Sequence, residues 1–229
     1  MTPILRAEFA HLVLGNQAIQ KLLDDFRFES VLDVGSGDGS HAACFMKAGK
    51  KVTTIDYGRS ASFLRKADGI STIVADFNAY TFPDRFDCIW CCHVLEHQLD
   101  PHTFLRRLHN TLREDGVLAL TVPPFRETIV GGHVSFWNAG LLLYRLVLAG
   151  FNCRDIALLR YGYNISAILH KRSIDVLGLL AYDSGDIQTI RPYLPDSIRF
   201  QVSADDTPFD GGIHELNWRR PPDTVPPPC

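Results

Sequence analysis

Short apolar runs alternate with amphipathic stretches along the first 170 residues of the chain. Runs rich in β-branched residues predict strands at 29–34, 51–55, 71–74, 86–91 and 116–122. Apolar residues at helical spacing predict helices at 17–26, 40–48, 59–66, 100–113 and 138–149. Alternation of this kind is typical of a parallel sheet with helices on both faces.

The segment after the last of these helices predicts a change of direction in the sheet. Gly150 closes the helix, because glycine suits the positive φ found at helix C-termini. Residues 152–160 and 164–170 then predict two strands joined by the short turn 161–163. A plain dinucleotide-binding domain would continue with parallel units instead.

Residues 31–40 (VLDVGSGDGS) predict a strand that enters a ligand-binding turn. Gly35, Gly37 and Gly39 stand at alternate positions, where a missing Cβ lets the backbone take positive φ or approach a ligand closely. The following helix would direct its N-terminus at that ligand. Asp33 stands two residues before the first glycine, where a carboxylate suits an ammonium group and would repel a pyrophosphate.

Acidic residues also follow the next two predicted strands. Asp56 ends the strand 51–55, where nucleotide-binding folds place the acceptor of the ribose hydroxyls. Asp76 and Phe77 follow the third strand and offer a carboxylate for an exocyclic amine and a ring for an adenine face. The residues up to this point leave nicotinamide, flavin and adenosyl-sulfonium cofactors open.

The order and spacing of these motifs resemble the class I S-adenosylmethionine-dependent methyltransferases, in the small-molecule group with a Val-Leu-Glu-His stretch after strand four. The matching stretches lie within residues 28–170, and include 31–39, 55–56, 75–77, 86–97 (FDCIWCCHVLEH) and 112–123 (LREDGVLALTVP). The resemblance implies a Rossmann-like α/β fold, with a mostly parallel seven-stranded sheet that ends in an antiparallel hairpin. It also implies S-adenosylmethionine as the cofactor.

The same resemblance assigns the cofactor-binding residues. The glycine turn and Asp33 would face the methionine end, Asp56 the ribose hydroxyls, and Asp76 with Phe77 the adenine. The end of strand four would lie beside the methionine ammonium. The full set is Asp33, Gly35, Ser36, Gly37, Gly39, Asp56, Tyr57, Asp76, Phe77, Cys91 and His93.

Histidines after the fourth and fifth predicted strands are the candidate catalytic residues. Methyl transfer from a sulfonium is an in-line displacement, and a hydroxyl acceptor must also lose a proton, which histidine accepts near neutral pH. His133 lies in a glycine-containing loop where similar proteins place a histidine that faces the acceptor, so it is the favoured base. His97 is the next candidate. His93, Glu96 and His97 would share one face if their stretch were helical.

These residues also have other interpretations. Glu96 and His97 would serve equally well to fix the loop after strand four through hydrogen bonds, and His133 to close over the cofactor without taking a proton. A divalent metal on His93, Glu96 and His97 is chemically allowed. We expect no metal, because the sequence shows no supporting second shell.

Composition and charge indicate an ordinary globular chain. It has 229 residues, 46% of them hydrophobic and 21% charged, with a net charge of -3. Basic residues are scattered, so nucleic acid is not an expected partner, and no apolar run suits membrane insertion. The six cysteines are expected to be structural thiols rather than disulfides or zinc ligands. Without a secretory signal, the expected location is cytoplasmic. The sequence leaves open whether the chain forms a homodimer.

We expect a core domain at 28–171, with the helical segment 1–27 as part of it. Residues 172–218 are expected to form a cap, extra strands or an oligomer contact, and 219–229 a disordered tail. The leading hypothesis is O-methylation of a small hydroxylated acceptor, such as a sugar or natural product. The alternatives are an NAD(P)-dependent oxidoreductase, disfavoured by the glycine spacing and Asp33, and a cofactor-binding module without turnover.

Overall fold

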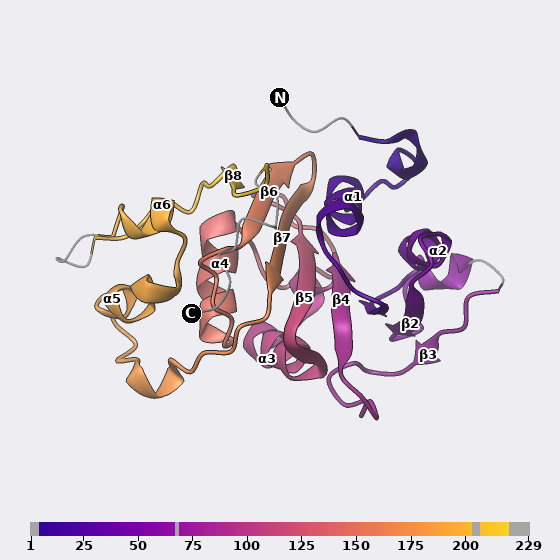
Figure 1. Ribbon diagram of the computed structural model, residues 1–229, viewed down its shortest axis with the longest axis horizontal. Helices are drawn as coiled ribbons and strands as arrows, with labels where there is room; N and C mark the ends of the chain where they lie inside the picture. The colour runs from indigo at the N-terminus through magenta and orange to yellow at the C-terminus, as the bar shows by residue number, and fades with distance from the viewer. Residues whose placement is uncertain (1–4, 67–68, 203–206, 220–229) are drawn as a thin grey trace.

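The computed structural model describes residues 5–66, 69–202 and 207–219, which fold around one central sheet (Figure 1). In these ranges the sheet has eight strands in the order β3-β2-β1-β4-β5-β7-β6-β8. The strands are β1 (Ser30–Val34), β2 (Lys51–Asp56), β3 (Ile73–Val74), β4 (Phe86–Cys92), β5 (Leu112–Val122), β6 (Ala157–Tyr161), β7 (Asn164–His170) and β8 (Glu215–Leu216). Strands β1 to β5 pair in parallel, whereas β7, β6 and β8 are added in antiparallel pairs.

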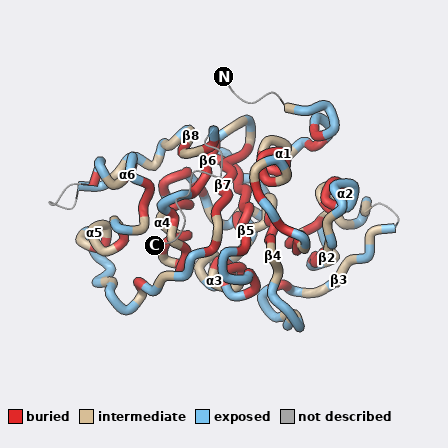
Figure 2. Tube along the Cα trace, in the orientation of Figure 1, coloured by how far each residue is buried: buried red, intermediate tan, exposed pale blue. Residues whose placement is uncertain are grey.

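Helices cover both faces of this sheet, as the alternating pattern predicted. The α-helices are α1 (Asn16–Asp25), α2 (Ser40–Lys47), α3 (Pro101–Thr111), α4 (Ala139–Leu148), α5 (Asp186–Ile190) and α6 (Asp196–Arg199). The 3-10 helices are Ala7–Phe9, Phe63–Arg65, Leu95–His97, Leu177–Leu179 and Arg191–Tyr193. Helices α1 and α2 pack on one face and α3 and α4 on the other. Figure 2 shows the buried residues gathered in the central strands and along the helices that cover them.

Successive residues of each strand supply two separate cores, because side chains alternate between the faces of a sheet. On β1, Val31 packs with α1 and α2, whereas Leu32 packs with α3 and α4. Trp90 on β4 is completely buried in the core between the sheet and helices α1 and α2. The five cysteines in the described ranges are free thiols.

The fold class is confirmed, with corrections to individual elements. The parallel sheet ends in the antiparallel hairpin of β6 and β7, and β8 adds an eighth strand to the seven expected. The predicted helix at 59–66 is wrong, since only Phe63–Arg65 forms a short 3-10 turn. That turn buries none of its residues, and Leu64 is 76% exposed. Without an apolar face packed on the sheet, a longer helix there lacks its main source of stability.

Residues 172–202 and 207–219 extend the sheet and core at the edge opposite β3 (Figure 1). Ile190 and Leu194 are completely buried in the same core as α4. Leu216 on β8 pairs with Leu158 on β6. This segment therefore packs as part of the same core. The expected tail lies outside the described residues, apart from Arg219. None of the helices in the described ranges has the length and apolar character needed to cross a lipid bilayer.

Candidate cofactor and acceptor site

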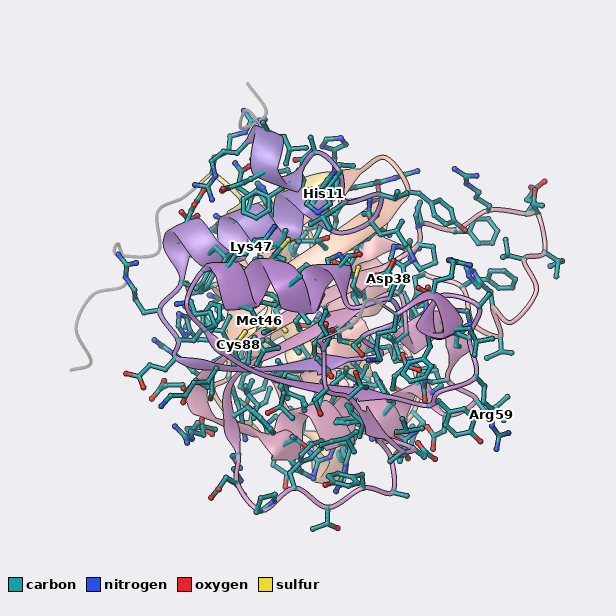
Figure 3. The ribbon with its side chains drawn as sticks, turned by 90° about the vertical axis from the view of Figure 1, so that its right-hand side faces the viewer. His11, Asp38, Met46, Lys47, Arg59 and Cys88 are labelled. Atoms are coloured by element: carbon teal, nitrogen blue, oxygen red, sulfur yellow. The ribbon has the colours of Figure 1, made fainter. Side chains whose placement is uncertain are left out.

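A cavity of about 1120 Å³ opens at the carboxyl ends of β1, β2 and β4. Parallel sheets bind ligands at this edge, at the point where the strand order reverses, and here that point lies between β1 and β4. The wall is built from residues 11–14, the turn after β1, the ends of β2 and β3, residues 92–100, His133 and Tyr163. Figure 3 labels two wall residues, His11 from the N-terminal segment and Asp38 from the glycine turn.

The turn after β1 requires glycine for both conformation and space. Gly35, Gly37 and Gly39 have φ angles of 73°, 51° and 83°, in the left-handed region that favours glycine. A Cβ on Gly35 would lie 2.3 Å from Cγ2 of Val94. Gly35, Ser36 and Gly37 line the cavity, whereas Gly39 caps the N-terminus of α2 and does not reach the wall.

Two buried polar atoms at this turn have no hydrogen-bond partner among the described residues. Asp33 is 1% exposed, and its Oδ2 accepts no hydrogen bond from the described residues. Burial, together with the nearby carboxylates of Asp56 and Asp38, raises the pKa of Asp33 to about 8. Oγ of Ser36 is also buried, and it has no hydrogen-bond partner within the part of the chain that the structure describes. Ser36 lines the cavity, whereas Asp33 is not among the wall residues. A ligand with an ammonium group and hydrogen-bonding atoms at this turn would satisfy both groups, so they fit the methionine end of an adenosyl-sulfonium cofactor.

Asp56 has a structural role in addition to its predicted one. Its Oδ2 accepts a hydrogen bond from the backbone N–H of Gly37 at 2.9 Å, and its Oδ1 accepts one from Gly58 at 2.8 Å. The carboxylate therefore fixes the glycine turn against the end of β2. It also lines the cavity, and each oxygen has a second lone pair available for a ligand hydroxyl.

The residues expected around adenine line the same cavity. Asp76 is exposed and accepts a hydrogen bond on Oδ1 from the backbone of Asn78 at 2.9 Å. Phe77 is buried and packs edge-on against Phe104, with ring centroids 5.4 Å apart. Tyr57 is 57% exposed on the wall. These side chains offer a ring surface and free carboxylate oxygen to a flat base.

The end of β4 differs from the sequence-based expectation at Cys91. This side chain is completely buried in the α3/α4 core and does not reach the cavity, because alternation along the strand turns it away. The neighbouring Cys92 lines the cavity instead. His93 follows with φ of 57°, and its Nε2 lies 3.1 Å from Oδ1 of Asn164. His93 also reaches the wall.

Glu96 is completely buried and has histidines around it. The segment forms the 3-10 turn Leu95–His97 instead of the α-helix considered from the sequence. Even so, Nδ1 of His93 lies 3.1 Å from Oε1 of Glu96, and Nε2 of His97 lies 3.9 Å from it. Neither carboxylate oxygen accepts a well-aligned hydrogen bond from the described residues. Single ligand atoms of Glu96, His97 and His133 lie within 4.8 Å of one another.

His133 is held near Glu96 by the backbone of its loop. The carbonyl oxygen of Glu96 accepts hydrogen bonds from the N–H groups of Val134 at 2.8 Å and Ser135 at 3.3 Å. Partial burial lowers the pKa of His133, and this outweighs the nearby Glu96 carboxylate, which raises it. The imidazole of His133 is therefore neutral near pH 7, with a lone pair available for a proton or an ion.

Comparison with known proteins identifies the central part of the chain. Residues 32–120 match the family model described as "Methyltransferase domain". A ubiquinone biosynthesis O-methyltransferase of Glaesserella parasuis is 31% identical over 105 residues, which are 41% of this chain and 44% of that protein. The chain thus spans less than half the length of this relative.

Solved structures share the fold. The 1,6-didemethyltoxoflavin-N1-methyltransferase of Burkholderia thailandensis has a TM-score of 0.54 at 20% identity, with 75% of this chain and 80% of that chain covered. A SAM-dependent methyltransferase from Archaeoglobus fulgidus has a TM-score of 0.57 at 16% identity, with 69% and 91% covered. The matching domain, the motifs and the sheet order together support a class I S-adenosylmethionine-dependent methyltransferase.

Proposed function

We propose that this protein transfers the methyl group of S-adenosylmethionine to a hydroxyl oxygen of a small acceptor. The observation that carries the proposal is the meeting of His97 and His133 beside the buried Glu96, in the same cavity as the glycine turn. One cavity then contains both a cofactor half and an acceptor half. Its volume of about 1120 Å³ suits two small ligands together.

The cofactor half is assigned from the turn after β1. The ammonium of the methionine end would pair with Asp33, and the ribose hydroxyls would donate to Asp56. The adenine would lie between Asp76 and Phe77. This arrangement is supported by the unpartnered Oδ2 of Asp33 and by the position of the other three residues on the cavity wall.

The acceptor half is assigned from the loop after β5. In the reaction, the acceptor oxygen forms a bond to the methyl carbon while the bond from that carbon to sulfur breaks. The hydroxyl proton moves to a neutral imidazole, with His133 as the first candidate and His97 as the second. Residues 11–14 line the cavity and would help to shield the reacting atoms from water.

The acceptor class is proposed as a hydroxylated small molecule, such as a sugar intermediate or a natural product. The relative in ubiquinone biosynthesis is named as an O-methyltransferase, which supports transfer to oxygen. The toxoflavin-pathway neighbour is named as an N1-methyltransferase, so nitrogen acceptors belong in any screen. A net charge of -3 supports a small molecule over nucleic acid, and the free thiols support a cytoplasmic location.

The test is an acceptor screen with methyl-labelled S-adenosylmethionine. Purified protein is incubated with matched pairs of acceptors that differ by one hydroxyl or amine, and S-adenosylhomocysteine and labelled product are both quantified. Label on oxygen of at least one acceptor supports the proposal. Label on nitrogen alone would overturn the oxygen assignment. Cofactor binding without label on any acceptor would favour a binding module without turnover.

A further inference from the structure

We propose that Glu96, His97 and His133 form a binding site for one divalent transition-metal ion of the zinc class, at the acceptor end of the cavity. The site was not apparent from the sequence, where His93 was grouped with Glu96 and His97. The loop after β5 supplies His133 as the third ligand instead. Two imidazoles and one carboxylate are a ligand set that Zn²⁺ accepts, with one coordination position left open.

The distances are compatible with one ion. The three ligand atoms lie within 4.8 Å of one another before any ion is present. Ligand atoms around a four-coordinate Zn²⁺ are separated by about 3.4 Å, given bonds of about 2.1 Å. Small side-chain rotations of His97 and His133, which are exposed and half-buried respectively, would close the difference.

The buried carboxylate is the second observation that points to a cation. Glu96 is 0% exposed, and both of its oxygens lack a hydrogen bond from the described residues. A buried carboxylate without such partners is costly, and a bound cation removes that cost. His93 and His97 both approach Oε1, at 3.1 Å and 3.9 Å, so Oε2 is left without a partner among the described residues.

His97 is oriented in the way that histidine ligands of metal ions usually are. Nδ1 of His97 donates a hydrogen bond to the carbonyl oxygen of Gly132 at 2.7 Å, which leaves the lone pair on Nε2. That nitrogen lies 3.9 Å from Oε1 of Glu96. Histidines that bind metal ions characteristically donate their other N–H to a carbonyl or carboxylate. The backbone therefore presets the side chain for an ion.

The role of the ion rests on the proposed function. An acceptor hydroxyl in the open coordination position would have a lowered pKa, lose its proton to solvent, and attack the methyl carbon as an alkoxide while the carbon–sulfur bond breaks. In the loaded protein, His97 and His133 then act as ligands, and the ion replaces the free imidazole as the activating group. The acceptor would be a molecule that presents an oxygen to the ion.

The test starts from full-length protein stripped with a chelator and titrated with ZnCl2 by calorimetry. We expect one equivalent to bind, with Glu96→Gln and His133→Ala each weakening the affinity at least tenfold. His214→Ala is the matched control, because His214 is exposed and outside the cavity, and it should bind like wild type. Absence of binding, or equal affinity in all four proteins, would overturn the site.

Parallel measurements separate this inference from the proposed function. S-adenosylmethionine binding is measured on the same stripped proteins, and retained binding in Glu96→Gln and His133→Ala shows that these variants are folded. Loss of methyl transfer on stripping, with recovery on ZnCl2 addition, supports the assigned role, whereas full turnover after stripping would refute it. Failure of wild type to bind S-adenosylmethionine would refute the proposed function, while the ZnCl2 titration would still decide the site.

Discussion

His97 donates a hydrogen bond from Nδ1 to the carbonyl oxygen of Gly132 at 2.7 Å, and this bond connects the turn after β4 to the loop that carries His133. The two histidine rings meet edge to face, with centroids 4.9 Å apart. Together with the hydrogen bonds from the loop to Glu96, this contact fixes the loop that carries His133 beside the turn after β4. The placement of His133 therefore depends on backbone geometry at Gly132.

Gly132→Ala should impair turnover through this contact. Gly132 has φ of 83°, and a Cβ there would lie 3.2 Å from Nδ1 of His97. We expect turnover to fall at least tenfold while affinity for S-adenosylmethionine stays within twofold of wild type. Gly131→Ala is the matched control, because a Cβ at Gly131 meets nothing within 4 Å. Equal turnover in the two variants would show that the loop geometry is not required.

Asp56→Ala should weaken cofactor binding. Its carboxylate holds the glycine turn through Gly37 and is proposed to accept the ribose hydroxyls. Loss of a hydrogen bond to a charged group costs about 1.5 to 3 kcal/mol, so calorimetry should show affinity for S-adenosylmethionine lowered by one to two orders of magnitude. Asp84→Ala removes an exposed carboxylate outside the cavity and should bind normally. Unchanged affinity in Asp56→Ala contradicts the placement.

Asp33 should make the ligand-free protein less stable as the pH rises. Burial raises the pKa of its carboxyl to about 8 in the folded state, well above the value in the unfolded chain. The folded state therefore binds more protons than the unfolded state between about pH 4 and pH 8, and its stability falls across this interval.

The isosteric variant Asp33→Asn removes this dependence. Urea unfolding near pH 4 should show little difference from wild type in the free energy of unfolding, whereas near pH 8 the variant should be the more stable protein. The same variant should bind S-adenosylmethionine more weakly, since it cannot pair with the ammonium. A stability difference that does not vary with pH would argue against the raised pKa.

His133→Ala should reduce turnover by roughly two to four orders of magnitude, the usual contribution of a residue that activates the acceptor. Affinity for S-adenosylmethionine should stay near normal, because the side chain belongs to the acceptor half of the site. His214→Ala, which removes an exposed histidine, serves as the control. Steady-state and binding measurements together check this prediction, and full activity in His133→Ala would remove the residue from the mechanism.

Local patterns were sufficient to predict the order of the main elements. The glycine turn, the hairpin and the helix that ends at Gly150 all follow from residues close together in the chain. The helix predicted at 59–66 was too long, because helical spacing alone does not show whether a face is buried, and only Phe63–Arg65 forms a short turn. The strand β8 was missed, since two residues that pair with β6 leave no periodic signal.

Some residues of the candidate site could be placed from the sequence, and others could not. Asp56 and the glycines stand directly at strand ends, so their place follows from the topology. Cys91 was misplaced by one position, because the point where a strand turns from core to cavity depends on packing. The approach of His133 to Glu96 depends on hydrogen bonds between segments about 40 residues apart, and no local pattern contains that information.

The central claim is that the cavity binds an adenosyl-sulfur cofactor, and calorimetric titration of the purified protein tests it most directly. S-adenosylmethionine, S-adenosylhomocysteine and NAD are titrated in parallel under the same conditions. We predict saturable binding of the two adenosyl-sulfur ligands and no binding of NAD. Binding of NAD alone would contradict the assignment of the glycine turn, and with it the proposed methyl transfer.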